Sequence, residues 1–163
     1  MTYLILLTSS IQYYKSTSSF HKRRDYMPKQ VIHSTGVLTR ESQTDSIQVN
    51  IVNLDRNYAH YIHVEIWDWS NHSNPVQLPI LVGEKQKVSF PYHLDSENLV
   101  VLSANLDDSI HFYEIRITHL DHSNIITNCF GRSLSSATGQ ESETVYHKQL
   151  VRVHQGYIPH PIL

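Results

Sequence analysis

Hydrophobic and polar residues alternate with a period of two in several segments of this chain. The clearest segment is YAHYIHVEIWDWS at residues 58–70, where the apolar residues Ile62, Val64 and Ile66 are each separated by one polar or charged residue. Successive side chains of a β-strand point to opposite faces, so this segment predicts a strand with one dry face. A helix would need apolar residues at i, i+3, i+4 and i+7, and the best windows fit the period of two instead.

Turn-forming residues separate these segments at roughly ten-residue intervals, which is typical of a β-sandwich or a small barrel. Asp55, Arg56 and Asn57 predict a hairpin turn, and Pro79 predicts an edge strand because proline cannot donate a ladder hydrogen bond. We expect an all-β protein, an antiparallel β-sandwich of jelly-roll or Ig-like type with about eight strands. The expected strands span residues 47–51, 58–69, 76–81, 87–92, 99–104, 113–118, 125–130 and 145–153.

The length and composition fit one β domain without a nucleic-acid or membrane partner. A chain of 163 residues is long enough to bury a core without disulfides or metals. Its ten tyrosines and two tryptophans favour half-buried sheet surfaces over helices. A formal net charge of −2 supplies no attraction toward nucleic acid or an anionic membrane. The single cysteine, Cys129, cannot form an internal disulfide and is either a buried thiol or one available to a neighbouring subunit.

Residues 1–26 differ in character from the rest of the chain. A short apolar run, Tyr3 to Thr8, precedes a basic cluster, which reverses the order found in secretory signals, and the run is too short to span a bilayer. The segment from Lys22 to Met27 can be encoded as AAA-AGG-AGA-GAT-TAT-ATG, in which AAGGAG ahead of ATG has the form of a bacterial ribosome-binding site. We expect residues 1–26 to be either untranslated leader, with translation starting at Met27, or a disordered tail.

The rest of the chain divides into an arm, a sandwich and a tail. Residues 27–45 predict an extended connector arm with a hinge candidate at Gly36, residues 46–153 the β-sandwich, and residues 154–163 a C-terminal tail. An extended arm can add to the open sheet edge of another subunit, whereas the alternative is that both ends are disordered or fold back on their own domain. The expected subunit-contact residues are Gln30, Ile32, Gly36, Val37, Leu38 and Thr39.

No catalytic or metal-binding set stands out, so we expect neither an enzyme nor a cofactor. Twelve histidines suggest metal binding, but His60 and His63 are three apart on a strand and point to opposite faces. His119 and His122 flank an expected turn without an obvious third ligand. The chain has no G-x-S-x-G motif, and Cys129 lies in no recognised catalytic context.

Tyr61, Trp67 and Trp69 share one face of the strand expected at residues 58–69. Flat aromatic side chains on a sheet stack against sugars or against another protein, because they bury much area at little entropic cost. These residues therefore predict a surface for glycans or proteins. The alternative is that this strand is buried on both faces, with Trp67 in the core.

Three segments resemble small uncharacterised β-sandwich proteins of spore-forming, low-GC bacteria. They are STGVLT at residues 34–39, QVNIVNLD at residues 48–55 and VEIWDWS at residues 64–70, and the resemblance covers most of residues 30–153. In general shape the chain is also similar to the pilus-like subunits of endospore appendages, which are single β-sandwich domains with an N-terminal connector that docks into a preceding subunit. Those subunits carry paired cysteines in the connector, whereas residues 27–44 contain none, so only their non-covalent assembly applies here.

This resemblance implies a structural, self-assembling fibre subunit at the spore surface or outside the cell, exported without a classical signal peptide. The cytoplasm is the other location left open. The expected partner is the chain itself, joined by strand addition of the arm with lateral contacts from the Trp67/Trp69 face, and other spore-surface proteins or glycans are further partners. The alternative function is a carbohydrate-binding or adhesion module that uses Tyr61, Trp67 and Trp69.

Overall fold

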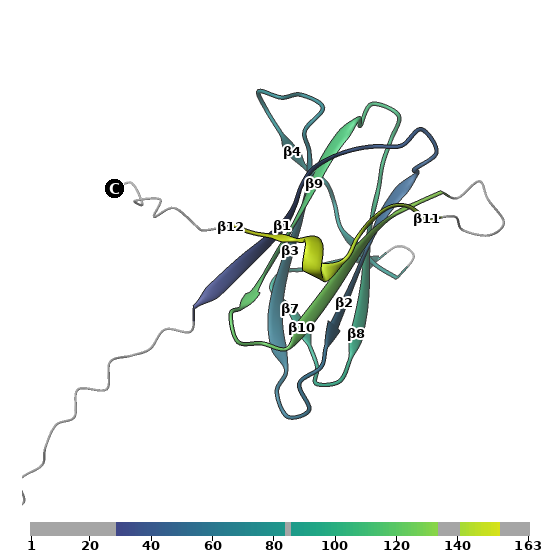
Figure 1. Ribbon diagram of the computed structural model, residues 1–163. Coiled ribbons are helices and arrows are strands. Elements are labelled where there is room, and N and C mark those ends of the chain that lie inside the picture. The colour runs from purple at the N-terminus through teal and green to yellow at the C-terminus, as the bar shows by residue number, and fades with distance from the viewer. Residues whose placement is uncertain (1–28, 84–85, 134–140, 154–163) are drawn as a thin grey trace, which may run out of the picture.

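Two antiparallel sheets packed face to face make up the computed structural model, which describes residues 29–83, 86–133 and 141–153 (Figure 1). The first sheet, called here the β1 sheet, has the order β12 (Val151–Val153), β1 (Gln30–Thr39), β9 (Phe112–Leu120), β3 (His60–Asp68) and β4 (Val76–Gln77), and β7 (Tyr92–Leu94) also pairs with β3. The second, the β2 sheet, has the order β11 (Glu141–Val145), β10 (Ile125–Arg132), β2 (Ser46–Asn53), β8 (Leu99–Asn105), β5 (Leu81–Val82) and β6 (Gln86–Lys87). A short 3-10 helix, η1 (His147–Gln149), leads from β11 to β12.

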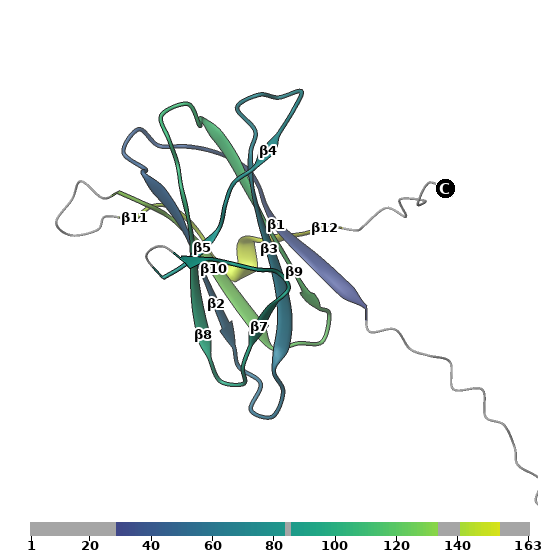
Figure 2. The same cartoon turned by 180° about the vertical axis from the view of Figure 1, so that it is seen from behind.

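The predicted all-β antiparallel sandwich is confirmed, but the chain between residues 76 and 94 is divided into more pieces than expected. The strands expected at residues 76–81 and 87–92 are the short strands β4, β5, β6 and β7, of which β4, β5 and β7 are labelled in the view from behind (Figure 2). Pro79 and Pro91 interrupt this region because they have no N–H to donate to a ladder. The expectations for residues 1–26 and 154–163 fall outside the described residues.

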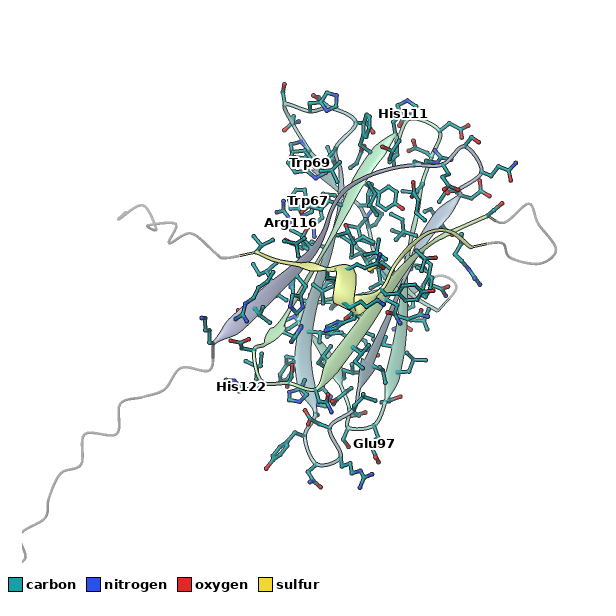
Figure 3. All side chains as sticks on the ribbon, viewed as in Figure 1. Trp67, Trp69, Glu97, His111, Arg116 and His122 are labelled. Carbon is teal, nitrogen blue, oxygen red and sulfur yellow. The ribbon has the colours of Figure 1, made fainter. Side chains whose placement is uncertain are left out.

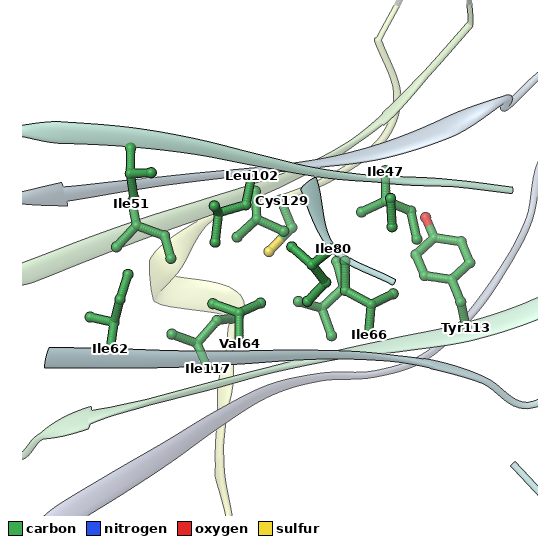
Figure 4. Close-up of a cluster of buried hydrophobic side chains, with 14 of the residues drawn as sticks. Ile47, Ile51, Ile62, Val64, Ile66, Ile80, Leu102, Tyr113, Ile117 and Cys129 are labelled. Carbon is green, nitrogen blue, oxygen red and sulfur yellow. The ribbon is translucent and has the colours of Figure 1, made fainter. Parts of the chain in front are cut away.

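The core lies between the two sheets and is built from alternate residues of their central strands (Figure 4). Ile62, Val64 and Ile66 of β3 are at most 1% exposed, which confirms the dry face predicted for this strand. β2 alternates in the same way, and its Ile47 and Ile51 are fully buried. Residues on the opposite face of each strand are therefore left to form the outer surfaces of the sandwich.

The segment Gln30–Thr39 differs from its expected role as a free connector arm, because it forms β1 inside the sandwich. It pairs with β9 from Gln30↔Leu120 to Thr39↔Phe112. Val31 is 3% exposed and Leu38 packs against the core, so both ends of the strand contribute apolar surface to the interior. Gly36, the hinge candidate, has a φ of 68° at the bulge between Ser34 and Val37. The expected subunit-contact residues therefore lie on a built-in strand.

Candidate functional site

The edge of β1 that faces away from β9 is only partly covered. β12 pairs with it at three positions, which are Ile32↔Val153, His33↔Arg152 and Ser34↔Val151. Within residues 29–83, 86–133 and 141–153, no strand pairs with this side of β1 beyond Ser34. Val37 is 55% exposed and Thr39 is also exposed, so this stretch presents backbone groups to which another strand can pair.

Residues 146–153, called here the covering segment, run from the end of β11 through η1 to β12 and cross from the β2 sheet to the β1 sheet (Figure 1). Half-buried Leu150 packs against the core, and Arg152 Nη2 donates to Asp121 Oδ2 at 2.7 Å. Val151 and Val153 remain 61% and 41% exposed. Because β12 is short and buries little apolar surface, its pairing with β1 is weaker than that of the long central strands.

Three histidines from different elements meet beside the covering segment and are called here the histidine cluster. They are His33 of β1, His119 of β9 and His147 of η1. His33 Nδ1 lies 3.3 Å from His119 Nε2, and the ring centroids of His33 and His147 are 5.4 Å apart in an edge-to-face arrangement. Burial, followed by the neighbouring histidines, lowers the pKa of His33 below its usual value. Burial also lowers the pKa of His119, against the opposing effect of the Leu120 carbonyl.

The two histidine pairs with ligand-like spacing, His60 with His63 and His119 with His122, each have their members in different environments. His60 points into the sandwich and contacts Asp55, whereas His63 lies on the outer face against Phe90. His119 is 5% exposed, whereas His122 is exposed in the turn after β9. In the part of the chain that the structure describes, no group of three or more His, Cys, Asp or Glu side chains is arranged to hold a metal ion.

Glu114 is the centre of a polar network on the outer face of the β1 sheet. It is 7% exposed and accepts hydrogen bonds from Ser34 Oγ at 2.6 Å, Trp69 Nε1 at 3.0 Å and Arg116 Nε and Nη2 at 3.0 and 2.8 Å. Burial opposes ionisation, but these hydrogen bonds, that of Arg116 foremost, hold the pKa of Glu114 below its usual value. The network ties β1 and β9 to the segment that follows β3.

The predicted surface aromatics lie on the outer face of the β1 sheet, but they do not form one exposed platform. Tyr61 is 62% exposed and contacts His93 edge to face at 5.1 Å. Trp67 is half-buried beneath Arg116, whose guanidinium carbon lies 5.7 Å from the centroid of the Trp67 ring (Figure 3). Trp69 is also half-buried, and its Nε1–H donates to Glu114. Trp67 is therefore outside the core. Trp69 belongs to the Glu114 network, whereas Trp67 contacts that network through the Arg116 guanidinium.

A shallow groove of about 350 Å³ lies beside Tyr61 on this outer face. Its polar lining comes from three strands, since Gln30 belongs to β1, Thr118 to β9, and His63 and Glu65 to β3. His63 Nε2 lies 3.8 Å from Glu65 Oε1. An exposed aromatic ring beside hydrogen-bonding side chains is an arrangement that can stack on a sugar ring.

Cys129 is buried in the core, 1% exposed, which decides between the two expectations for this thiol (Figure 4). Burial raises the pKa of its thiol to about 12. The thiolate is the reactive form of cysteine, so this residue is inert in the folded protein.

The histidine cluster was not found from the sequence, because its members are far apart in the chain and share no motif.

In comparisons with protein-family models, with curated proteins and with solved structures, no match to this chain was found. Among the described residues there is no helix with the length and apolar character needed to cross a membrane.

Proposed function

We propose that this is a non-catalytic structural protein that associates with further copies of itself by backbone pairing along the edge of β1. The observation that carries the proposal is that β12 holds this edge at only three positions, while its Val151 and Val153 remain exposed. An edge strand of this kind is a template for another strand. The proposal keeps the self-association expected from the sequence and changes the role of Gln30–Thr39 from donor to acceptor.

The donor in this proposal is the covering segment of a second copy. It already pairs with β1 in its own chain, so its register and side chains suit this edge. Its Leu150 packs against the core and can occupy the same place against the core of another copy. Exchange of an identical element between copies is a low-cost route to association. If each copy donates its covering segment to the next copy and the assembly does not close into a ring, the exchange produces a fibre. A fibre suits the spore-surface or extracellular role that the resemblance implies.

A peptide competition tests this assembly on the full chain. A synthetic peptide of residues 146–153 in excess should cap the β1 edge and shorten or abolish fibres seen by negative-stain electron microscopy. The matched control is the same peptide with Val151→Pro, which has no backbone N–H to donate at the position opposite Ser34 and should leave the fibres intact. Equal fibre lengths with both peptides would refute pairing at this edge.

The groove beside Tyr61 supports a second candidate function, the binding of a neutral glycan. Its exposed ring and the side chains of Gln30, Glu65 and Thr118 offer one stacking surface with hydrogen-bond donors and acceptors. Binding to a panel of immobilised glycans should then be lost on Tyr61→Ala and retained on Tyr58→Ala, because Tyr58 is 69% exposed but does not line the groove. Equal binding by both variants, or no binding by the unmodified chain, would exclude this groove as a glycan site.

A further inference from the structure

The hydrogen bonds of the histidine cluster fix which ring nitrogens carry protons at neutral pH. His119 Nδ1 lies 2.8 Å from the Leu120 carbonyl oxygen, which can only accept, so this nitrogen carries the proton. His119 Nε2 is then an acceptor, and His33 Nδ1–H donates to it across 3.3 Å. The Thr127 backbone N–H donates to His147 Nδ1 at 3.3 Å, so that nitrogen is an acceptor as well.

Both acceptor nitrogens are therefore already occupied by donors from other elements. A proton added to His147 Nδ1 would face the Thr127 N–H, and a proton added to His119 Nε2 would face the N–H of His33. In each case a hydrogen bond is replaced by two opposed donors in a partly desolvated place. The bond to Thr127 joins η1 to β10, and β12 lies directly beyond η1, so its loss acts on the covering segment.

The charged groups around the cluster do not offer a ready counter-ion for an added proton. Arg152 of β12 adds a positive charge near His33, and His60 of β3 is a further histidine near His119. Asp121 at the end of β9 favours protonation of both His33 and His119, but its carboxylate is paired with Arg152 at 2.7 Å. Asp55 contacts His60.

We propose that the histidine cluster is an acid-sensitive lock on the covering segment. At neutral pH the covering segment stays on β1. When the cluster is protonated, the segment is released, and the β1 edge can accept the covering segment of a second copy. The release stands on the geometry of the cluster alone, and only the pairing with a second copy rests on the proposed function.

The direction of the pH effect follows from the lowered pKa values of His33 and His119. A histidine whose pKa is lower in the closed state than the usual value of about 6.5 stabilises the closed state fully above that pH. This contribution is lost as the pH falls below about 6.5 and through the lowered pKa. Acidification therefore favours release, and each unit of lowering corresponds to about a tenfold change in the opening equilibrium.

Two variants separate the lock from the assembly that follows it. His119→Gln with His147→Asn places an amide oxygen near each acceptor nitrogen, so the hydrogen bonds from His33 and Thr127 are kept while these two positions can no longer be protonated. Ile32→Cys with Val153→Cys joins two directly opposed residues, and its disulfide holds β12 on β1 at any pH. His111→Asn is the control, because His111 is exposed and lies at the other end of the sandwich from His122 and the turn after β9 (Figure 3).

The test measures amide hydrogen exchange of residues 146–153 in the full chain at pH 7.5 and pH 5, corrected for intrinsic rates, together with particle mass by light scattering. Exchange should rise about tenfold or more on acidification in the unmodified chain and in His111→Asn. It should rise less in the double amide variant, in which only His33 of the cluster can still be protonated, and should not rise in the oxidised disulfide variant. Equal rises in the unmodified and double amide chains, or no rise in either, would overturn the lock. A rise without any increase in particle mass would support the lock and remove the proposed self-association.

Discussion

Trp69 Nε1 donates a hydrogen bond of 3.0 Å to Glu114 Oε2, although Trp67, two residues earlier, has a buried Nε1 with no partner among the described residues. The pair of tryptophans thus offers a comparison within one segment. Trp69→Phe removes a donor from a buried carboxylate and should lower the free energy of unfolding by about 1.5–3 kcal/mol. Urea denaturation of the purified protein measures this difference.

Trp67→Phe is the matched control, since it deletes an N–H that makes no hydrogen bond and keeps an aromatic ring under Arg116. It should cost less than Trp69→Phe. A larger cost for Trp67→Phe would show that packing, rather than the bond to Glu114, decides the role of this aromatic pair.

The stability of the sandwich should fall in acid partly through Glu114. A carboxyl group whose pKa is lower when folded than when unfolded contributes stability above its unfolded value, near 4.5, and this contribution is lost as the pH falls through the folded pKa. Thermal unfolding between pH 6 and pH 3 should therefore show a smaller drop in Tm for Glu114→Gln than for the unmodified protein. Parallel pH profiles would mean that this carboxylate is not stabilised by its hydrogen bonds.

Gly36 should resist substitution for reasons of backbone conformation alone. Its φ is 68°, which disfavours L-residues, while a Cβ added there would meet nothing within 4 Å. Gly36→Ala should lower the free energy of unfolding by about 1–2 kcal/mol, and Gly36→Asn by less, because asparagine tolerates this region. Equal effects of the two substitutions in chemical denaturation would contradict this explanation.

Cys129 should be protected from thiol reagents until the sandwich unfolds. Because the thiol is 1% exposed and burial raises its pKa to about 12, reaction with a disulfide reagent at pH 8 should occur only through global opening. The reaction rate should then increase with urea in step with the unfolding transition. A fast reaction in buffer alone would place the thiol in a region that opens locally.

The sequence was sufficient to predict β3 and β2, because Ile62, Val64 and Ile66 in one and Ile47, Val49 and Ile51 in the other keep a strict period of two and pair in unbroken register. The strand β1 was harder to recognise. Its inward residues are Val31 and Leu38, an odd number of positions apart, because the bulge at Gly36 changes the phase of the alternation. A change of phase at a glycine is the local signal that could have identified it.

The candidate sites depend on contacts between segments distant in the chain. His33 and His119 are 86 positions apart, and His147 comes from a third element. Spacing along the sequence carries no information on such a cluster and singles out only neighbouring pairs, His60 with His63 and His119 with His122. The outward aromatics were predicted as a group, but the commitment of Trp69 to Glu114 follows only from the pairing of β3 with β9.

Electron microscopy of the full-length Ile32→Cys, Val153→Cys variant at pH 5 tests the central claim most directly. The account predicts monomer-sized particles when the disulfide is formed and regular fibres after reduction, with the unmodified chain forming fibres under both conditions. Fibres from the oxidised variant would show that assembly does not require release of the covering segment, and monomers throughout, from the unmodified chain as well, would contradict self-association by exchange of the covering segment.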